Sequence, residues 1–191
     1  MQSADGIVCA AVKDLRMTKT KNRRKHMMVA YGSLMSHQSI RETIPDRHFT
    51  PVIVKGYQRI FNLAVEHGKW PDVLNVGKAS RNSFNGLLFK VTDAELRKIK
   101  EREDDYNLAE TWAYDFLTGQ RLCRCLVSTD VIVALDQRRR KPSKRYFILC
   151  REAAYHVSQE FGVFWDATTY TANGQTVANW IKKNKSYNTL A

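Results

Sequence analysis

The sequence lacks the marks of several protein classes. It has no run of about 18 apolar residues, so no membrane-spanning helix is expected, and its early stretch IVCAAV is too short for a secretory signal. Its four cysteines form no CxxC pair and have no histidines at zinc-ligand spacing, which disfavours a metal site or a disulfide framework. No internal repeat or low-complexity segment is present. These absences favour a cytoplasmic protein, although the basic, acid-poor start leaves a transit peptide open.

Acidic residues are scarce relative to basic ones. The 191 residues include 31 Lys and Arg against 19 Asp and Glu, giving a net charge of +12 and a pI near 9.7. Much of the excess lies in residues 1–26 and in DQRRRKPSKR at 136–145. Such clusters suit nucleic acid, a membrane surface or an acidic small molecule, but charge runs more often mark solvated segments. We therefore expect a basic, flexible N-terminal extension at 1–26 and one globular domain at 27–191.

Hydrophobic periodicity predicts strands through the middle of the chain and helices towards its end. Residues 51–65 are rich in β-branched and aromatic residues and contain Gly56, which indicates a long or bent strand. This order favours an α+β fold with a curled or barrel-like sheet. The other predicted strands are 27–31, 73–80 and 84–91 joined by a turn, 110–116, 120–128 and 131–135; the predicted helices are 93–102, 143–161 ending at Gly162, and 174–186.

Few residues offer acid–base chemistry from their sequence context alone. The five histidines lie in five unrelated contexts and are expected to be exposed or structural. Glu103, in KEREDDYNLAE, follows the predicted helix and has acidic neighbours, so a partly buried carboxyl with a raised pKa is expected there. A solvated acidic turn is the simpler interpretation on composition alone. A nucleophilic cysteine is not expected, because activation needs a nearby base or positive field, which the sequence does not show.

Five sequence elements occur in a fixed order: YGSLM at 31–35, KGYQRIFN, the strand FNGLLFKV followed by a helix, the RE..Y element at Arg102, Glu103 and Tyr106, and PSKRY at 142–146. Together they resemble the γ-glutamylcyclotransferase-like family. The resemblance covers about residues 28–170. It implies a small mixed β-barrel with flanking helices that converts γ-glutamyl compounds to 5-oxoproline and a free amine, without metal or organic cofactor.

The resemblance also implies roles for individual residues. Tyr31, Gly32, Ser33 and Leu34 would form the loop around the γ-glutamyl group, where Gly32 permits close approach of the backbone. Glu103 would be the catalytic acid/base. Tyr146 would lie near the bound substrate, and Tyr106 would help to position Glu103.

The sequence is compatible with more than one substrate and with more than one function. YGSLM and RE are similar to the glutathione-specific branch, whereas KGYQRIFN is similar to branches acting on γ-glutamyl amino acids or γ-glutamylamines. The run at Arg138–Arg140 is hypothesised to line the pocket entrance and favour an anionic leaving group. Two other functions are a binding module that keeps the fold without turnover, and nucleic-acid binding through the basic segments. The sequence shows no motif of interleaved basic and aromatic residues for the latter.

Overall fold

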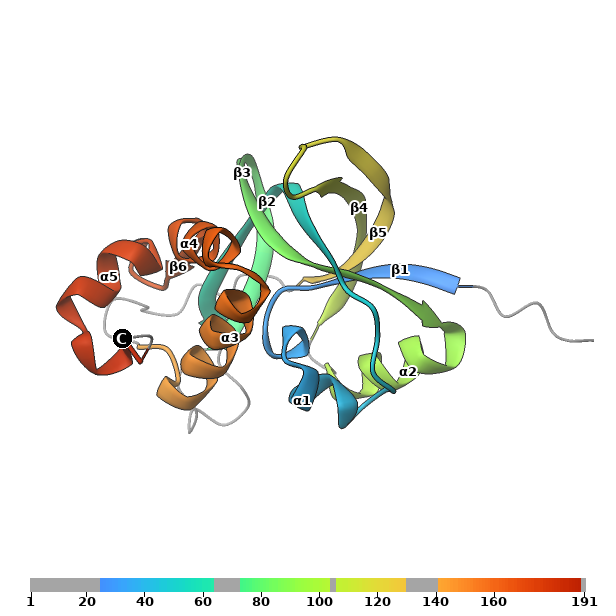
Figure 1. The fold of residues 1–191 in the computed structure, drawn as a ribbon, viewed down its shortest axis with the longest axis horizontal. Helices are drawn as coiled ribbons and strands as arrows, with labels where there is room; N and C mark the ends of the chain where they lie inside the picture. The colour runs from blue at the N-terminus through green and yellow to red at the C-terminus, as the bar shows by residue number, and fades with distance from the viewer. Residues whose placement is uncertain (1–24, 64–72, 104–105, 130–140, 190–191) are drawn as a thin grey trace, which may run out of the picture.

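Five strands close into a ring in the computed structural model, which describes residues 25–63, 73–103, 106–129 and 141–189 (Figure 1). Neighbouring strands pair in the order β3–β1–β5–β4–β2, and a further pairing of β2 with β3 closes the ring. β1 and β5 are parallel, whereas the other pairs of the ring are antiparallel. The predicted α+β fold with a mixed barrel is confirmed. The strands are β1 (Lys25–Ala30), β2 (Thr50–Leu63), β3 (Val73–Thr92), β4 (Asn107–Asp115), β5 (Arg121–Thr129) and β6 (Thr169–Thr171), the last paired with β2.

Helices cover one side and one end of this barrel. Figure 1 shows α3, α4 and α5 beside the barrel, and α1 and α2 at its lower edge. Predictions for residues 1–24, the strand at 131–135 and Arg138–Arg140 lie outside the described residues. The helical elements are η1 (Ser33–Met35), α1 (His37–Arg41), α2 (Asp93–Arg102), α3 (Lys144–Val157), α4 (Gln159–Thr168), α5 (Val177–Lys183) and η3 (Lys185–Tyr187).

The strand predicted at 27–31 corresponds to β1, which begins two residues earlier. Lys25 and His26 already pair with Thr92 and Val91 of β3. Met28, Val29 and Ala30 are all buried, because β1 lies between β3 and β5 inside the sheet. The continuous apolar run therefore reflects a strand that is covered on both faces.

Helix α2 agrees with its predicted bounds because its start signal is local. The Thr92 hydroxyl accepts a hydrogen bond from the Glu95 backbone N–H, and the Glu95 carboxylate accepts one from the Thr92 N–H. This capping box satisfies two N–H groups at the helix start. Its bounds place Glu103 directly after the last helical residue.

The turn predicted between 73–80 and 84–91 is wrong, because both segments belong to the single strand β3. Both halves pair with β2, with Lys55 opposite Ser83 and Tyr57 opposite Lys78. Residues 79–82 therefore bulge opposite Gly56, whose φ of +83° lets β2 bend at the same level. The polar residues read as a turn instead occupy this bulge.

The single helix predicted at 143–161 is also wrong, since α3 ends at Val157 and α4 begins at Gln159. Ser158 between them is extended, with φ −168° and ψ 165°, and its hydroxyl accepts a hydrogen bond from the Phe161 N–H at 3.1 Å. Ser158 therefore caps a new helix. Gly162, predicted as a stop, lies inside α4, where a Cβ atom would stand 2.4–2.6 Å from the Tyr155 ring.

Gly162→Ala tests this close approach of α3 and α4. Alanine stabilises a helix relative to glycine by up to about 1 kcal/mol. However, the new Cβ would overlap the Tyr155 ring atoms nearest the main chain, and a rotation of the ring alone does not move them away. We expect the free energy of unfolding in urea to fall by about 1–3 kcal/mol. The control Val163→Ala, at a half-exposed neighbour, should change it by less than about 0.5 kcal/mol. A Gly162→Ala protein as stable as wild type would contradict the packing.

Candidate active site

Strand β1 leads directly into the loop of residues 31–34. Tyr31, Gly32 and Leu34 are buried, and the N–H of Met35 donates to the Gly32 carbonyl at 3.0 Å to form η1. A Cβ atom on Gly32 would stand 2.8 Å from the Tyr146 hydroxyl oxygen. A side chain at this position would therefore require the Tyr146 hydroxyl to shift, whereas the φ of −126° does not itself call for glycine.

Glu103 follows α2 and is held by backbone hydrogen bonds on both sides. Its N–H donates to the Ile99 carbonyl at 2.9 Å, and its carbonyl accepts from the Tyr106 N–H at 2.8 Å. The side chain is 19% exposed. Burial raises the pKa of the Glu103 carboxyl above its usual value, while the Arg102 guanidinium, 3.6 Å away, opposes that rise. The raised pKa agrees with the expectation, with burial as its first cause.

Two tyrosines approach Glu103 from different elements. The Tyr106 hydroxyl donates to the Leu74 carbonyl of β3, which fixes the ring against the barrel. Tyr146 lies in the first turn of α3, and its ring meets Phe61 edge-to-face with centroids 6.4 Å apart. Burial holds the pKa of Tyr146 well above 10.0, so its hydroxyl stays protonated and can donate a hydrogen bond.

One small cavity joins all seven residues predicted for the site. Its volume is about 20 Å³, roughly the space of one water molecule. The lining runs from residue 29 to residue 146, so segments far apart in the chain meet at one point, from β1, η1, α2, β4, β5 and α3 or the segments beside them. The lining residues are Val29, Ala30, Tyr31, Gly32, Ser33, Leu34, Glu103, Tyr106, Ser128 and Tyr146.

Ser128 was not singled out from the sequence. It is 4% exposed, lies next to the end of β5 and is placed at the cavity by the parallel pairing of β5 with β1. The available signal was a polar residue at the end of the apolar strand RLCRCLVS. That signal is common in strands, and only the pairing with β1 makes Ser128 a cavity residue.

Arg102 ties the loop, α1 and α2 together. Its Nη1 donates to the Ser39 carbonyl at 2.7 Å and to the Thr43 hydroxyl at 2.8 Å. Its Nη2 donates to the Ser39 hydroxyl at 2.7 Å and reaches the Ser33 hydroxyl at 3.5 Å. A planar guanidinium can serve these acceptors together, which an ammonium cannot. Arg102 thereby sets both the position of the loop and the electrostatic surroundings of Glu103.

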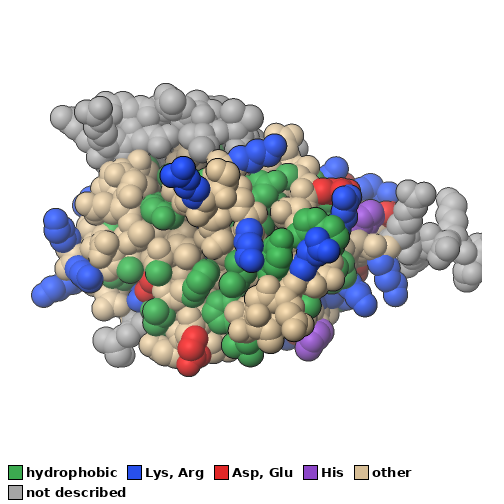
Figure 2. Space-filling view, turned by 90° about the horizontal axis from the view of Figure 1, so that it is seen from above, with side chains coloured by type: hydrophobic (Ala, Val, Ile, Leu, Met, Phe, Trp, Pro, Cys, Tyr) green, Lys and Arg blue, Asp and Glu red, His purple; other side chains and the backbone are tan. Residues whose placement is uncertain are grey.

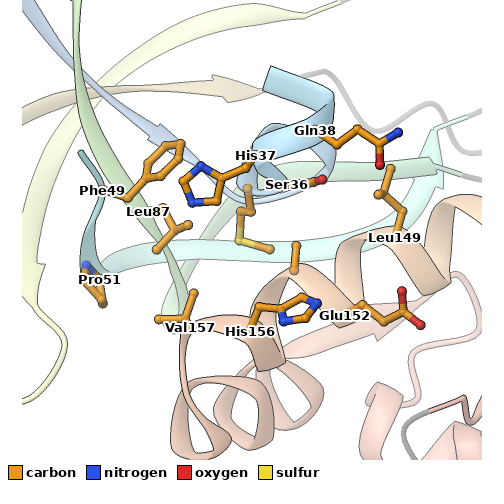
Figure 3. Close-up of a pocket in the computed structure, with 12 residues that line it drawn as sticks. Ser36, His37, Gln38, Phe49, Pro51, Leu87, Leu149, Glu152, His156 and Val157 are labelled. Atoms are coloured by element: carbon orange, nitrogen blue, oxygen red, sulfur yellow. The ribbon is translucent and has the colours of Figure 1, made fainter. Parts of the chain in front are cut away.

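Larger hollows flank this cavity on the side of α1 and α3. One, of about 390 Å³, lies between η1–α1 and α3 and contains His37 and His156 (Figure 3). Both histidines are exposed, as predicted, and the His37 ring lies 2.8 Å from the Asp46 carboxylate. A second, of about 650 Å³, is lined by α1 and α3 residues and shares Tyr146 with the small cavity. Tyr146 therefore lines both the small cavity and the larger hollow.

The cysteines among the described residues lack the lowered pKa that nucleophilic catalysis needs. Burial raises the pKa of Cys150 to about 12 and that of Cys125 to about 12, so both are neutral thiols at pH 7. Within the described ranges, no group of three or more His, Cys, Asp or Glu side chains could hold a metal ion. No helix in these ranges is long and apolar enough to cross a membrane.

Comparison with known proteins identifies the fold. No family model and no curated protein sequence matches the chain. Among solved structures, a γ-glutamyl cyclotransferase matches with a TM-score of 0.64 and 16% identity, over 84% of this chain and 99% of that one. An uncharacterised human protein matches with a TM-score of 0.61 and 15% identity, over 85% and 98%. YkqA from Bacillus subtilis matches with a TM-score of 0.58 and 19% identity, over 75% and 53%.

This chain has the γ-glutamyl cyclotransferase fold. The likeness extends over nearly the whole of the solved cyclotransferase chain, so the barrel and the flanking helices both belong to it. The fold predicted from the five ordered motifs is thus confirmed, although sequence identity is low throughout.

Glu103→Gln tests the burial of the carboxyl in the cyclotransferase fold through the pH dependence of stability. Because the folded pKa is raised above 4.5, the folded protein binds more protons than the unfolded chain between pH 4.5 and that pKa. Wild-type stability therefore loses this contribution as pH rises through the window, and glutamine removes the effect. We expect Glu103→Gln to gain stability relative to wild type from pH 4 to pH 8 in urea unfolding. A difference that stays constant from pH 4 to pH 8 would contradict it, and Glu101→Gln, at an exposed position of the same helix, is the matched control.

Arg102→Lys tests the bridge between α2 and α1. A lysine Nζ could replace Nη1 but would leave the Nη2 bonds to the Ser39 and Ser33 hydroxyls unmade, so we expect a loss of about 1–3 kcal/mol in unfolding free energy and faster amide exchange in α1. The control Arg97→Lys lies on the exposed face of the same helix and should change stability by less than about 0.5 kcal/mol. Equal effects of both substitutions would count against the bridge.

Proposed function

We propose that this protein is a γ-glutamylcyclotransferase that releases 5-oxoproline and a free amine from a small γ-glutamyl compound. The observation that carries the proposal is the pairing of a largely buried carboxyl, Glu103, with the loop of residues 31–34 across one cavity. The fold likeness to a γ-glutamyl cyclotransferase supports it. The proposed substrate is a small molecule, with no metal or organic cofactor in the reaction.

In the proposed reaction Glu103 moves one proton. Its carboxylate takes a proton from the α-ammonium group of the γ-glutamyl moiety, and the resulting amine attacks the γ-carbonyl carbon. A C–N bond forms and closes the five-membered ring. Glu103 then returns the proton to the departing amine nitrogen as the original amide C–N bond breaks, and the ring nitrogen gives up its second proton to the released amine or to solvent, which leaves the neutral lactam of 5-oxoproline. The attack is intramolecular, so holding the substrate in the reactive geometry supplies much of the acceleration.

The loop of residues 31–34 is proposed to hold the γ-glutamyl group. The first N–H groups of η1 have no acceptor within their own turn, and such groups can bind a carboxylate or a developing oxyanion. Gly32 lets a ligand approach the backbone without a side chain in the way. Tyr31, Ser33 and Leu34 supply the surrounding wall.

Tyr146 is proposed to move when substrate binds. The cavity of about 20 Å³ is too small for a γ-glutamyl group, and the Tyr146 hydroxyl occupies the space next to Gly32. Rotation of this side chain would join the cavity to the hollow of about 650 Å³ on its other side. The γ-glutamyl moiety would then lie at Glu103 and the leaving amine in the larger hollow, where the Tyr146 hydroxyl can hydrogen-bond the substrate.

A substrate panel tests the proposed activity. Purified protein is incubated with γ-glutamyl-alanine, glutathione and γ-glutamyl-lysine, and 5-oxoproline is measured. We expect product from at least one compound, a loss of at least about 100-fold in kcat for Glu103→Gln with binding largely retained, and unchanged activity for Glu101→Gln. Folded protein that makes no 5-oxoproline from all three, or a fully active Glu103→Gln, would overturn the proposal for these substrates.

A further inference from the structure

The outer face of β2, β4 and β5 carries basic and aromatic side chains in alternation. Lys55 Nζ lies 4.1 Å from the centre of the Tyr114 ring. The Trp112 ring has two guanidinium groups over it, with Arg121 Cζ at 4.4 Å and Arg124 Cζ at 5.5 Å. These five residues are called the basic–aromatic face. They are separated in the sequence, which is why no interleaved motif is visible there, and the sheet alone brings them together.

Strand register explains this arrangement. Trp112 pairs with Arg124 and Tyr114 with Arg121 across β4 and β5, while Tyr114 pairs with Ile53 of β2. Directly opposed residues project from the same side of a sheet, so the two aromatic side chains and both arginines share one face. Trp112 is 36% exposed, although a tryptophan on a soluble protein is usually more covered.

More positive charge borders this face. Lys78 and Arg81 are exposed, and the register of β2 with β3 places them beside Gly56, next to Lys55. Figure 2, which looks down on the upper part of Figure 1, shows Lys and Arg side chains among hydrophobic ones, with Asp and Glu near the margins. Glu110 is the acidic partner of Arg124, at 3.3 Å, and both side chains are about two-thirds exposed or more. Such an ion pair contributes little and can be exchanged for a phosphate.

We propose that the basic–aromatic face binds single-stranded nucleic acid. Lysine and arginine would pair with successive phosphates, and exposed bases would stack on Trp112 or on the guanidinium planes beside it. Stacking needs unpaired bases, which favours a single strand over a duplex. The combination of flat aromatic and guanidinium groups favours nucleic acid over an anionic membrane, which would need positive charge but no ring to stack against. This inference does not depend on the proposed enzymatic activity.

Titration of the full chain with a labelled oligonucleotide tests the proposal. The probe is a fluorescein-labelled 12-nucleotide oligo(U), followed by anisotropy at several salt concentrations, with the same-length duplex and phosphatidylserine vesicles as comparisons. We expect Trp112→Ala to weaken binding of the single strand by about 5-fold or more, because each stacked base contributes about 1–3 kcal/mol. The double variant Arg121→Gln/Arg124→Gln should lower the salt slope by about 1.4.

A charge-matched control distinguishes binding at the basic–aromatic face from general electrostatic attraction to the protein. Lys98→Gln/Lys100→Gln removes the same charge from the exposed side of α2 and should leave the affinity within about 2-fold. Circular dichroism and thermal unfolding of each variant show whether it is folded, and Trp112→Phe should retain most of the affinity if stacking is responsible.

Several results would overturn the proposal. One is an oligonucleotide affinity that is the same for wild type, for Trp112→Ala and for the arginine double variant, all folded. That result would assign the binding to other basic segments. Another is a duplex or a vesicle bound more tightly than the single strand. A third is a concentration-dependent dimer that Trp112→Ala abolishes, with no oligonucleotide binding, which would make the face a contact between copies of the chain.

Discussion

The buried guanidinium of Arg59 holds the barrel to the helices, and the rest of the structure depends on it. Arg59 is fully buried on β2 and donates to the Thr169 hydroxyl at 2.8 Å, the Asn85 carbonyl at 2.6 Å and the Asn85 side-chain oxygen at 2.9 Å. Burial lowers its pKa to about 9, so it is still charged at neutral pH. The cation lies 4.8 Å from the Trp165 ring, and these partners offset the cost of burying it. One side chain thereby joins β2, β3, α4 and β6.

This joint sets the geometry of the candidate site. Arg59 fixes β2 against β3. One end of β3 then places the Leu74 carbonyl where the Tyr106 hydroxyl donates to it. The other half of β3 pairs with β1, which fixes the position of Tyr31 directly after β1. On the helical side, Phe61 of β2 packs against Phe147 and Trp165, which orients the first turn of α3 and therefore Tyr146. The walls of the cavity therefore belong to elements whose relative positions are fixed by packing elsewhere, and the Tyr146 hydroxyl occupies the space next to Gly32.

The sequence predicted features that depend on local signals and missed those that depend on pairing. The capping pair Thr92 and Glu95 acts within one turn, so α2 was found with its bounds, and Glu103 with it. The bulge at 79–82 has the polar composition of a turn, and only the pairing of both halves of β3 with β2 excludes one. Arg102 was recognised as part of a motif, but its hydrogen bonds to Ser39 and Thr43 require the fold. Three of the five ordered motifs, YGSLM, RE..Y and PSKRY, contain the seven predicted site residues that line the cavity, because a resemblance to a family carries information on spatial contacts that composition lacks.

Two opposing influences on Glu103 suit it to the proposed proton transfer. Burial alone favours the neutral acid, which could not accept a proton, whereas a fully solvated carboxylate would be too weak a base to take one from an ammonium group. The Arg102 guanidinium limits the rise in pKa, and the same guanidinium holds the loop at Ser33 and helix α1. A substrate that displaces Tyr146 would replace one covering group by another, so Glu103 would stay shielded from water during the reaction. The influence of Arg102 is therefore expected to persist in the complex, because its hydrogen bonds to Ser39 and Thr43 do not involve the residue that moves.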